Sequence, residues 1–136
     1  MTSIPEQARP GGDAAVRFLV VDDTKEVRWL VRVLLEDEPS WEVVAEGATG
    51  AEAVDQAAAV RPDVVLLDMS MPVMDGLEAL PQLRELLPDA LLVLLTAFPV
   101  SEVDGSARSF GADACLDKVA MADNLVPALR TLLARR

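Results

Sequence analysis

The sequence contains no histidine, and its only cysteine is Cys115. A chain without imidazole cannot carry a phosphohistidine and cannot use a Ser-His or Cys-His catalytic pair. One cysteine allows no disulfide within the chain, which suits a reducing compartment. If phosphoryl groups reach this chain, another molecule must therefore deliver them.

The sequence also lacks the segments that direct proteins to membranes. No apolar run is long enough to span a bilayer, and the N-terminus lacks the basic-then-apolar order of a signal peptide. Residues 1–14 hold two prolines and two adjacent glycines among polar residues, which is typical of a disordered lead-in. We therefore expect a soluble, cytoplasmic protein whose folded part begins at residue 15.

The length and charge of the chain limit its organisation and its partners. Its 136 residues suffice for one domain with a sizeable core. The formal net charge of −11 would repel the phosphate backbone of nucleic acids. We therefore expect no direct contact between this polypeptide and nucleic acid.

Apolar and amphipathic segments alternate five times along the chain. The segments between and after the apolar runs carry apolar residues at helical spacing and predict helices, the last two at residues 100–110 and 121–134. This alternation predicts an α/β fold with a parallel sheet and helices on both faces. The apolar runs that predict its strands are residues 17–21, 41–45, 64–68, 90–96 and 113–117.

Two predicted helix starts carry the pattern of a capping box, in which residues three apart satisfy each other's backbone N–H groups. Asp23 and Glu26 fit this pattern before the first helix, and Thr49 and Glu52 fit it before the second. For Asp23, helix capping is thus a structural alternative to a functional role.

Three predicted helices contain residues that disfavour a regular helix. Pro81 lies in the first turns expected after Gly76, so we expect the regular helix to begin nearer Pro81 or its first turn to be distorted. Pro127 is expected to fray or bend the start of the last helix. Gly105 and several serines make residues 100–110 the weakest predicted helix.

Polar residues follow four of the apolar runs. Asp22 and Asp23 follow the first run, Asp68 ends the third, Thr96 ends the fourth, and Lys118 follows the fifth. Each alone would be a polar residue that merely ends a strand. In an open parallel sheet, however, ligands bind beyond the carboxyl ends of the strands, so we expect these side chains to converge there.

The carboxylates of Asp22, Asp23 and Asp68 would crowd one pocket. Like charges at short range raise each other's proton affinity unless a cation lies between them. Oxygen ligands without histidine or cysteine favour Mg²⁺ or Mn²⁺ over zinc. The cluster therefore predicts a divalent-cation site.

These residues, in this order and spacing, resemble the receiver domain of two-component response regulators. The similarity runs from Arg17 to the C-terminus. It implies a single flavodoxin-like (βα)₅ domain over residues 15–136, with a five-stranded parallel sheet of order 2-1-3-4-5. The residues that carry the resemblance are Asp22, Asp23, Asp68, Met71, Pro72, Val73, Met74, Asp75, Gly76, Thr96 and Lys118.

The resemblance implies a phosphorylation-operated conformational switch rather than an enzyme with a separate substrate. Asp68 would accept a phosphoryl group from a sensor histidine kinase or a phosphotransfer protein. Lys118 would hold Asp68 and neutralise charge, and Thr96 would donate its hydroxyl to a phosphoryl oxygen.

The resemblance also implies which groups bind the cation. Asp23 and Asp68 would bind Mg²⁺ directly, and Asp22 would bind it mainly through water. The backbone carbonyl of Ser70 would complete the protein ligands.

Four positions depart from the family's pattern or tune it. Cys115 stands where most receivers carry a tyrosine or phenylalanine that moves with the threonine, and Val119 stands where many have a cis-proline. Ser70 and Phe98 occupy positions that help to set how fast the acyl phosphate hydrolyses, and we expect Phe98 to shield it from water. We expect output to a homodimer partner or an effector through the face of the fourth helix, fifth strand and fifth helix, driven by the Thr96 loop.

Two other functions fit part of the pattern. A receiver that signals without phosphorylation, as a protein-interaction module, is left open by Cys115 and Val119. A phosphohydrolase of the haloacid dehalogenase type is disfavoured, because Ser70 stands where many such enzymes have a second aspartate. The sequence fits both a stand-alone receiver and the receiver half of a transcription regulator with a helix-turn-helix effector.

Overall fold

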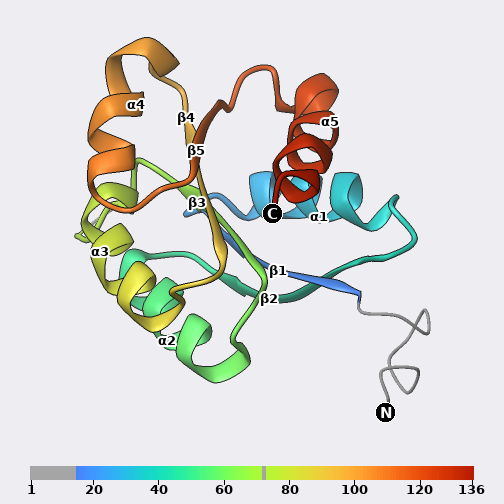
Figure 1. The fold of residues 1–136 in the computed structure, drawn as a ribbon, viewed down its shortest axis with the longest axis horizontal. Helices are drawn as coiled ribbons and strands as arrows, with labels where there is room; N and C mark the ends of the chain where they lie inside the picture. Colours follow the sequence, from blue (N-terminus) through green and yellow to red (C-terminus); the bar gives the residue numbers. More distant parts are fainter. Residues whose placement is uncertain (1–14, 72) are drawn as a thin grey trace.

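Strands and helices alternate along the chain in the computed structural model, which describes residues 15–71 and 73–136 (Figure 1). The strands are β1 (Val16–Val21), β2 (Trp41–Gly47), β3 (Val64–Asp68), β4 (Leu91–Thr96) and β5 (Ala114–Asp117). The helices are α1 (Lys25–Glu36), α2 (Gly50–Val60), α3 (Gly76–Leu86), α4 (Val100–Ser109) and α5 (Met121–Ala134).

The five strands form one sheet in the order β2-β1-β3-β4-β5, and every neighbouring pair is parallel. The α/β fold class and the strand order predicted for the chain are therefore confirmed. All five residues of the central strand β3 are buried. Such a strand consists of consecutive apolar residues because helices cover both faces of the sheet.

The register of the sheet aligns the carboxyl ends of four strands. Val21, the last residue of β1, lies beside the residue that precedes Asp68. Asp68 pairs with Leu95, and Thr96 pairs with Asp117. Neighbouring strands lie about 4.8 Å apart, so the residues that follow β1, β3, β4 and β5 meet at one edge of the sheet.

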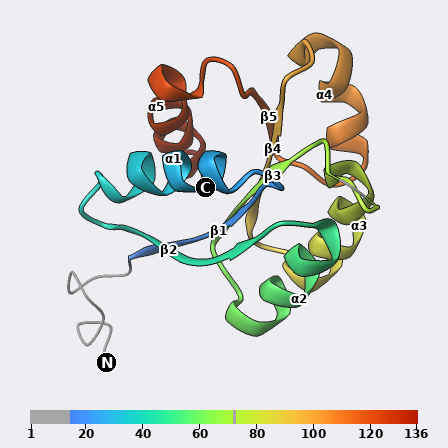
Figure 2. The same ribbon diagram turned by 180° about the vertical axis from the view of Figure 1, so that it is seen from behind.

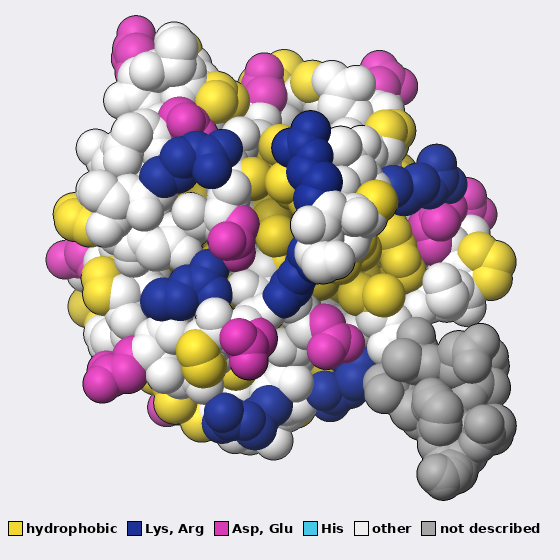
Figure 3. Space-filling model, in the orientation of Figure 1, with side chains coloured by type: hydrophobic (Ala, Val, Ile, Leu, Met, Phe, Trp, Pro, Cys, Tyr) yellow, Lys and Arg dark blue, Asp and Glu magenta, His cyan; other side chains and the backbone are white. Residues whose placement is uncertain are grey.

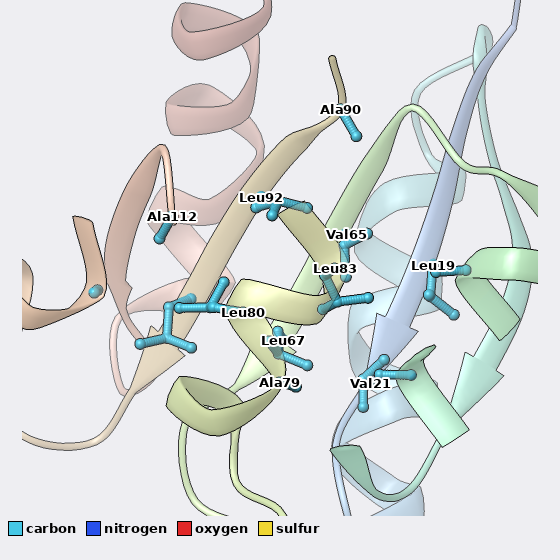
Figure 4. Close-up of a cluster of buried hydrophobic side chains, with 14 of the residues drawn as sticks. Leu19, Val21, Val65, Leu67, Ala79, Leu80, Leu83, Ala90, Leu92 and Ala112 are labelled. Atoms are coloured by element: carbon cyan, nitrogen blue, oxygen red, sulfur yellow. The ribbon is translucent and has the colours of Figure 1, made fainter. Parts of the chain in front are cut away.

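Two hydrophobic clusters hold this edge in place, one on each face of the sheet. Helices α1 and α5 cover one face, and α2, α3 and α4 cover the other (Figure 2). On the second face, Leu80 and Leu83 of α3 share a cluster with Leu67 and Leu92 of the sheet (Figure 4). A fully buried leucine contributes roughly 1.5–3 kcal/mol, so the strand ends are anchored by a large core.

The start of α1 differs from the prediction. Thr24 is the N-cap residue, and no side chain caps the helix, so the capping box predicted for Asp23 and Glu26 is wrong. The helix begins at Lys25, which leaves Asp23 one position too early to cap it. The Asp23 carboxylate instead accepts a hydrogen bond from the Thr24 hydroxyl at 3.4 Å.

The second helix has half of its predicted capping box. Thr49 Oγ1 accepts a hydrogen bond from Glu52 N at 3.1 Å, whereas the Glu52 carboxylate accepts one from Ala48 N at 2.7 Å. The preceding strand β2 continues to Gly47, two residues beyond its predicted end.

In the described part of the chain, no helix has the length and apolar character needed to cross a membrane.

Both helices that contain proline are continuous. α3 begins at Gly76, so the late or distorted start predicted from Pro81 is wrong. Asp75 and Glu78 form a complete capping box there. Burial of the α3 leucines, at roughly 1.5–3 kcal/mol each, outweighs the cost of about 3 kcal/mol for an internal proline. α5 is helical from Met121 through Pro127, so its start is not frayed, and the alternative of a bend stays a prediction.

Candidate functional site

Asp68 ends the central strand and is only 3% exposed. Its Oδ1 accepts a hydrogen bond from Ser70 N at 3.3 Å. The following loop is held by backbone hydrogen bonds from Met69 N to the Leu95 carbonyl and from Gly76 N to the Met69 carbonyl, both 2.9 Å long. These bonds fix the position of the carboxylate at the strand end.

The loop after Asp68 contains a strained residue. Val73 has a φ of +68°, a left-handed conformation that is an outlier for a β-branched residue. This conformation costs roughly 1–2 kcal/mol, and the Val73 side chain is fully exposed and gains nothing from burial. The neighbouring Met74 carbonyl accepts a hydrogen bond from Gly50 N of α2 at 3.2 Å, which helps to hold the loop in this shape.

Asp22 and Asp23 bring two further carboxylates to Asp68. One oxygen from each of the three lies within 4.8 Å of the others. Asp22 is buried, and its Oδ1 accepts a hydrogen bond from Thr24 N at 2.8 Å. Asp23 is exposed. A buried carboxylate beside two more carboxylates fits a site for a divalent cation.

Lys118 joins two of these carboxylates through ion pairs. Its Nζ lies 2.7 Å from Oδ2 of Asp22 and 3.2 Å from Oδ1 of Asp68. Its backbone N–H donates to the Thr96 carbonyl at 2.8 Å, which positions the side chain from the neighbouring strand. Burial alone would lower the pKa of Lys118, but the hydrogen bond and charge of Asp22 and the charge of Asp68 raise it overall. The ammonium therefore stays charged and opposes three carboxylates.

The balance of charge at Asp68 is unfavourable to its ionised form. Burial raises the pKa of Asp68, and the negative charge of Asp22 raises it further. The charge of Lys118 and the Ser70 N–H act in the opposite direction without cancelling this increase. A cation bound among the carboxylates would supply the positive charge that the protein groups leave missing.

The Thr96 hydroxyl is bonded to its own loop. Thr96 is fully buried at the end of β4. Its Oγ1 accepts a hydrogen bond from Phe98 N at 2.9 Å and donates to the Phe98 carbonyl at 3.4 Å. Phe98 itself is half exposed, and its shielding of a phosphoryl group stays a prediction.

Cys115 and Val119 lie on either side of Lys118 in the sequence, in different environments. Cys115 is buried on β5. Burial raises the pKa of its thiol, the charge of Asp104 raises it further, and Arg108 opposes them, so the thiol stays protonated near neutral pH. Val119 is exposed, and its N–H donates to the Asp117 carboxylate at 2.8 Å.

Arg28 supports the loop that carries Asp22 and Asp23, a role that the sequence did not predict. Its Nη1 donates to the Asp22 carbonyl at 2.6 Å, and its Nε donates to Glu46 of β2 at 3.0 Å. Glu46 also pairs with Arg32. Sequence spacing reveals ion pairs within a helix, at three or four residues, but not one between a helix and a strand, so no signal in the sequence pairs Arg28 with Glu46.

The ion pairs of Glu46 give a testable dependence of stability on pH. Burial alone would raise the pKa of Glu46, but the hydrogen bonds and charges of Arg32 and Arg28 lower it overall. The unfolded chain therefore takes up a proton first as the pH falls, and the stabilisation is complete above the ordinary pKa of about 4.3 and is lost below it. We expect Glu46→Gln to lower the free energy of unfolding by about 0.5–1 kcal/mol near neutral pH.

Urea denaturation at a series of pH values measures this effect. The difference between wild type and Glu46→Gln should shrink as the pH falls through the acidic range. Glu85→Gln, an exposed change on α3, serves as the matched control and should behave as wild type throughout. A difference that stays constant with pH would mean that the charge of Glu46 contributes nothing.

Comparison with known proteins agrees with this geometry. The chain matches the model of the response regulator receiver domain over residues 18–130. It belongs to this family. Receivers of this family are the response-regulator part of two-component systems, and the acidic cluster of Asp22, Asp23 and Asp68 could hold the Mg²⁺ ion that they bind.

Two solved receivers share the fold of this one. A two-component response regulator of the LuxR family from Aurantimonas sp. SI85-9A1 is 32% identical, with a TM-score of 0.82 over 88% of this chain and 86% of that one. The signal receiver domain of the putative response regulator NarL from Mycobacterium tuberculosis is 33% identical, with a TM-score of 0.80 over 89% of this chain and 98% of that one.

One relative is longer than this chain. The response regulator protein VraR from Staphylococcus epidermidis is 34% identical over 116 residues, which are 85% of this chain and 56% of VraR. The chain thus spans about half the length of this relative.

Proposed function

We propose that this receiver is a phosphorylation-operated switch whose phosphoacceptor is Asp68. The observation that carries the proposal is a buried carboxylate at a strand end, paired with Lys118 and clustered with two further carboxylates. A sensor histidine kinase or a phosphotransfer protein would supply the phosphoryl group, since this chain has no histidine of its own. The chain would catalyse only its own phosphorylation and dephosphorylation.

A divalent cation fits the acidic cluster of this receiver. Asp23 and Asp68 would bind Mg²⁺ directly, Asp22 would bind mainly through water, and Ser70 would contribute its backbone carbonyl. Mn²⁺ suits the same oxygen ligands. When bound, the ion neutralises charge between the carboxylates and an incoming phosphoryl group. The close grouping of the three carboxylates and the raised pKa of Asp68 support this assignment.

The side chains of the site would divide the phosphoryl transfer among them. An Asp68 carboxylate oxygen attacks phosphorus while the P–N bond of the donor's phosphohistidine breaks, which yields an acyl phosphate. Lys118, 3.2 Å from Asp68, stabilises the charge on the phosphoryl oxygens. The Thr96 hydroxyl gives up its donation to the Phe98 carbonyl and donates to a phosphoryl oxygen instead. This exchange moves the Thr96 loop when Asp68 is phosphorylated.

The proposal predicts a single phosphoryl adduct that depends on a divalent cation. Incubation with acetyl phosphate and Mg²⁺ should add the mass of one phosphoryl group to the intact chain. Replacing Mg²⁺ by EDTA should remove nearly all of the adduct, because the uncompensated carboxylates repel the anionic donor. Adduct in EDTA at full yield would contradict the role of the metal, and absence of adduct under both conditions would contradict the proposal.

The partners of the switch follow from its surface and its relatives. We propose that a homodimer partner or an effector binds the face of α4, β5 and α5. No direct contact with nucleic acid is proposed, because the net charge is −11 and basic side chains are interspersed with acidic ones on the face shown in Figure 3. The similarity to a LuxR-family response regulator supports a role in transcription control, and we propose that the protein acts in the cytoplasm.

A second candidate function is an interaction module that signals without phosphorylation. Cys115 favours it, since the usual moving ring on β5 is missing. Beryllofluoride with Mg²⁺ mimics the acyl phosphate and separates the two functions. Changes of chemical shift or hydrogen exchange on the α4-β5-α5 face support the switch, whereas binding at Asp68 with no change on that face supports the interaction module.

A further inference from the structure

A hollow of about 190 Å³ lies between α4, β5 and α5, beside the position where most receivers carry an aromatic ring. Its walls include Val100 of α4, Cys115 and Leu116 of β5, and Met121 and Leu125 of α5. The thiol of Cys115 is too small to fill this space. Since an apolar cavity of about 150 Å³ can hold a benzene molecule, the hollow has room for one phenyl ring.

Phe98 carries a ring that is within reach of this hollow. The residue is 52% exposed. It lies two residues before Val100, a wall residue, and two residues span at most about 7 Å. It also lies two residues after Thr96, whose strand partner Asp117 is another wall residue. The backbone of Phe98 therefore lies near the rim of the hollow.

The Thr96 hydroxyl controls the backbone of Phe98. It accepts a hydrogen bond from the Phe98 N–H at 2.9 Å and donates to the Phe98 carbonyl at 3.4 Å. A hydroxyl has one hydrogen to donate. Donation to a phosphoryl oxygen on Asp68 therefore ends the donation to the Phe98 carbonyl, and a shift of the hydroxyl toward the phosphoryl group pulls on the remaining bond from the Phe98 N–H.

We propose that Phe98 enters the hollow when Asp68 is phosphorylated and supplies the mobile ring that β5 lacks, in place of the shielding role expected from the sequence. The inference rests on the proposed function, because phosphorylation provides the new acceptor for Thr96. Transfer of a half-exposed ring from water into an apolar hollow favours the inward position. The filled hollow would change the surface shared by α4, β5 and α5, which a partner could then recognise.

Methyl NMR of the full chain with labelled methionines tests this movement. Met121 lines the hollow, so a ring that enters it should shift the Met121 methyl signal upfield. The shift and a nuclear Overhauser effect to the Phe98 ring should both require beryllofluoride and Mg²⁺. Phe98→Ala should lose both signals, whereas Phe110→Ala, which removes another half-exposed ring at the far end of α4, should keep them.

Two results would overturn the inference and leave the phosphoacceptor intact. One is a Met121 methyl that does not move while signals around Asp68 respond to beryllofluoride. The other is a Met121 shift that persists in Phe98→Ala. If beryllofluoride does not bind and acetyl phosphate yields no adduct, the proposed function fails, and the inference fails with it.

Alkylation of Cys115 provides an independent measurement, since this is the only cysteine of the chain. A ring in the hollow covers the thiol, so beryllofluoride with Mg²⁺ should slow the reaction with iodoacetamide several-fold. The same addition should not slow it in Phe98→Ala. Equal slowing in both proteins would contradict the movement of Phe98.

Discussion

Replacement of Asp68 by asparagine should lower the rate of phosphoryl uptake by about three orders of magnitude or more. An amide oxygen lacks the negative charge of the attacking carboxylate. Asp22 offers no ready substitute, because its oxygens already face the Thr24 N–H and the Lys118 ammonium. Intact mass after incubation with acetyl phosphate and Mg²⁺ should show the adduct in wild type and none in Asp68→Asn.

Asp89→Asn is the matched control for this experiment. Asp89 is exposed in the loop before β4, at the opposite end of the strand from Thr96, so its variant should form as much adduct as wild type. Full adduct in Asp68→Asn would contradict the assignment of Asp68. Peptide mapping would then locate the true acceptor, for which Asp23, the exposed carboxylate of the same cluster, is the first candidate.

The same substitution should raise the melting temperature of the metal-free protein. Because burial and the charge of Asp22 raise the pKa of Asp68, its ionised form is disfavoured in the folded state at neutral pH. The ion pair with Lys118 lowers the pKa of Asp68 and so favours its ionised form, but this effect is the weaker one because the pKa is raised overall. Mg²⁺ should stabilise wild type more than Asp68→Asn, so the difference in melting temperature should narrow or reverse as Mg²⁺ is added.

The convergence of the acidic side chains was predictable from the sequence because each follows an apolar run. Strands covered on both faces are built from apolar residues, so a polar residue such as Asp68 marks the strand end. The parallel topology then brings these ends to one edge. Asp22 follows β1 and Lys118 follows β5. Their atoms Oδ2 and Nζ lie 2.7 Å apart because both strands end at this edge.

Arg28 and Pro81 show which features the sequence alone could not provide. The contact of Arg28 with Glu46 depends on how α1 lies against the end of β2, and no local pattern records that packing. At Pro81, helix propensity predicts disruption, but the capping box at Asp75 and the buried leucines of α3 outweigh it. Local rules thus failed where long-range packing contributes more free energy than the local preference removes.

Gly76, which begins α3 after the loop that follows Asp68, leaves no room for a side chain. A Cβ atom there would lie 2.4 Å from the Asp68 carbonyl oxygen, 2.8 Å from Leu94 Cδ1 and 3.0 Å from Met69 Cα. The first and third of these atoms belong to the backbone, which cannot move aside without shifting the end of β3. Gly105 of α4 offers a contrast, because a Cβ atom there meets nothing within 4 Å.

Gly76→Ala should therefore lower the free energy of unfolding by about 2–3 kcal/mol, whereas Gly105→Ala should raise it by about 0.5–1 kcal/mol. Gly105 lies inside α4 and gains the higher helix propensity of alanine, whereas Gly76 is the first residue of α3 and gains less, so the steric clash dominates there. Urea denaturation measures the two changes. Gly76→Ala should also slow adduct formation, because relief of the clash displaces the Asp68 carboxylate. Equal stability of the two variants would mean that the loop can move away from the strand end without cost.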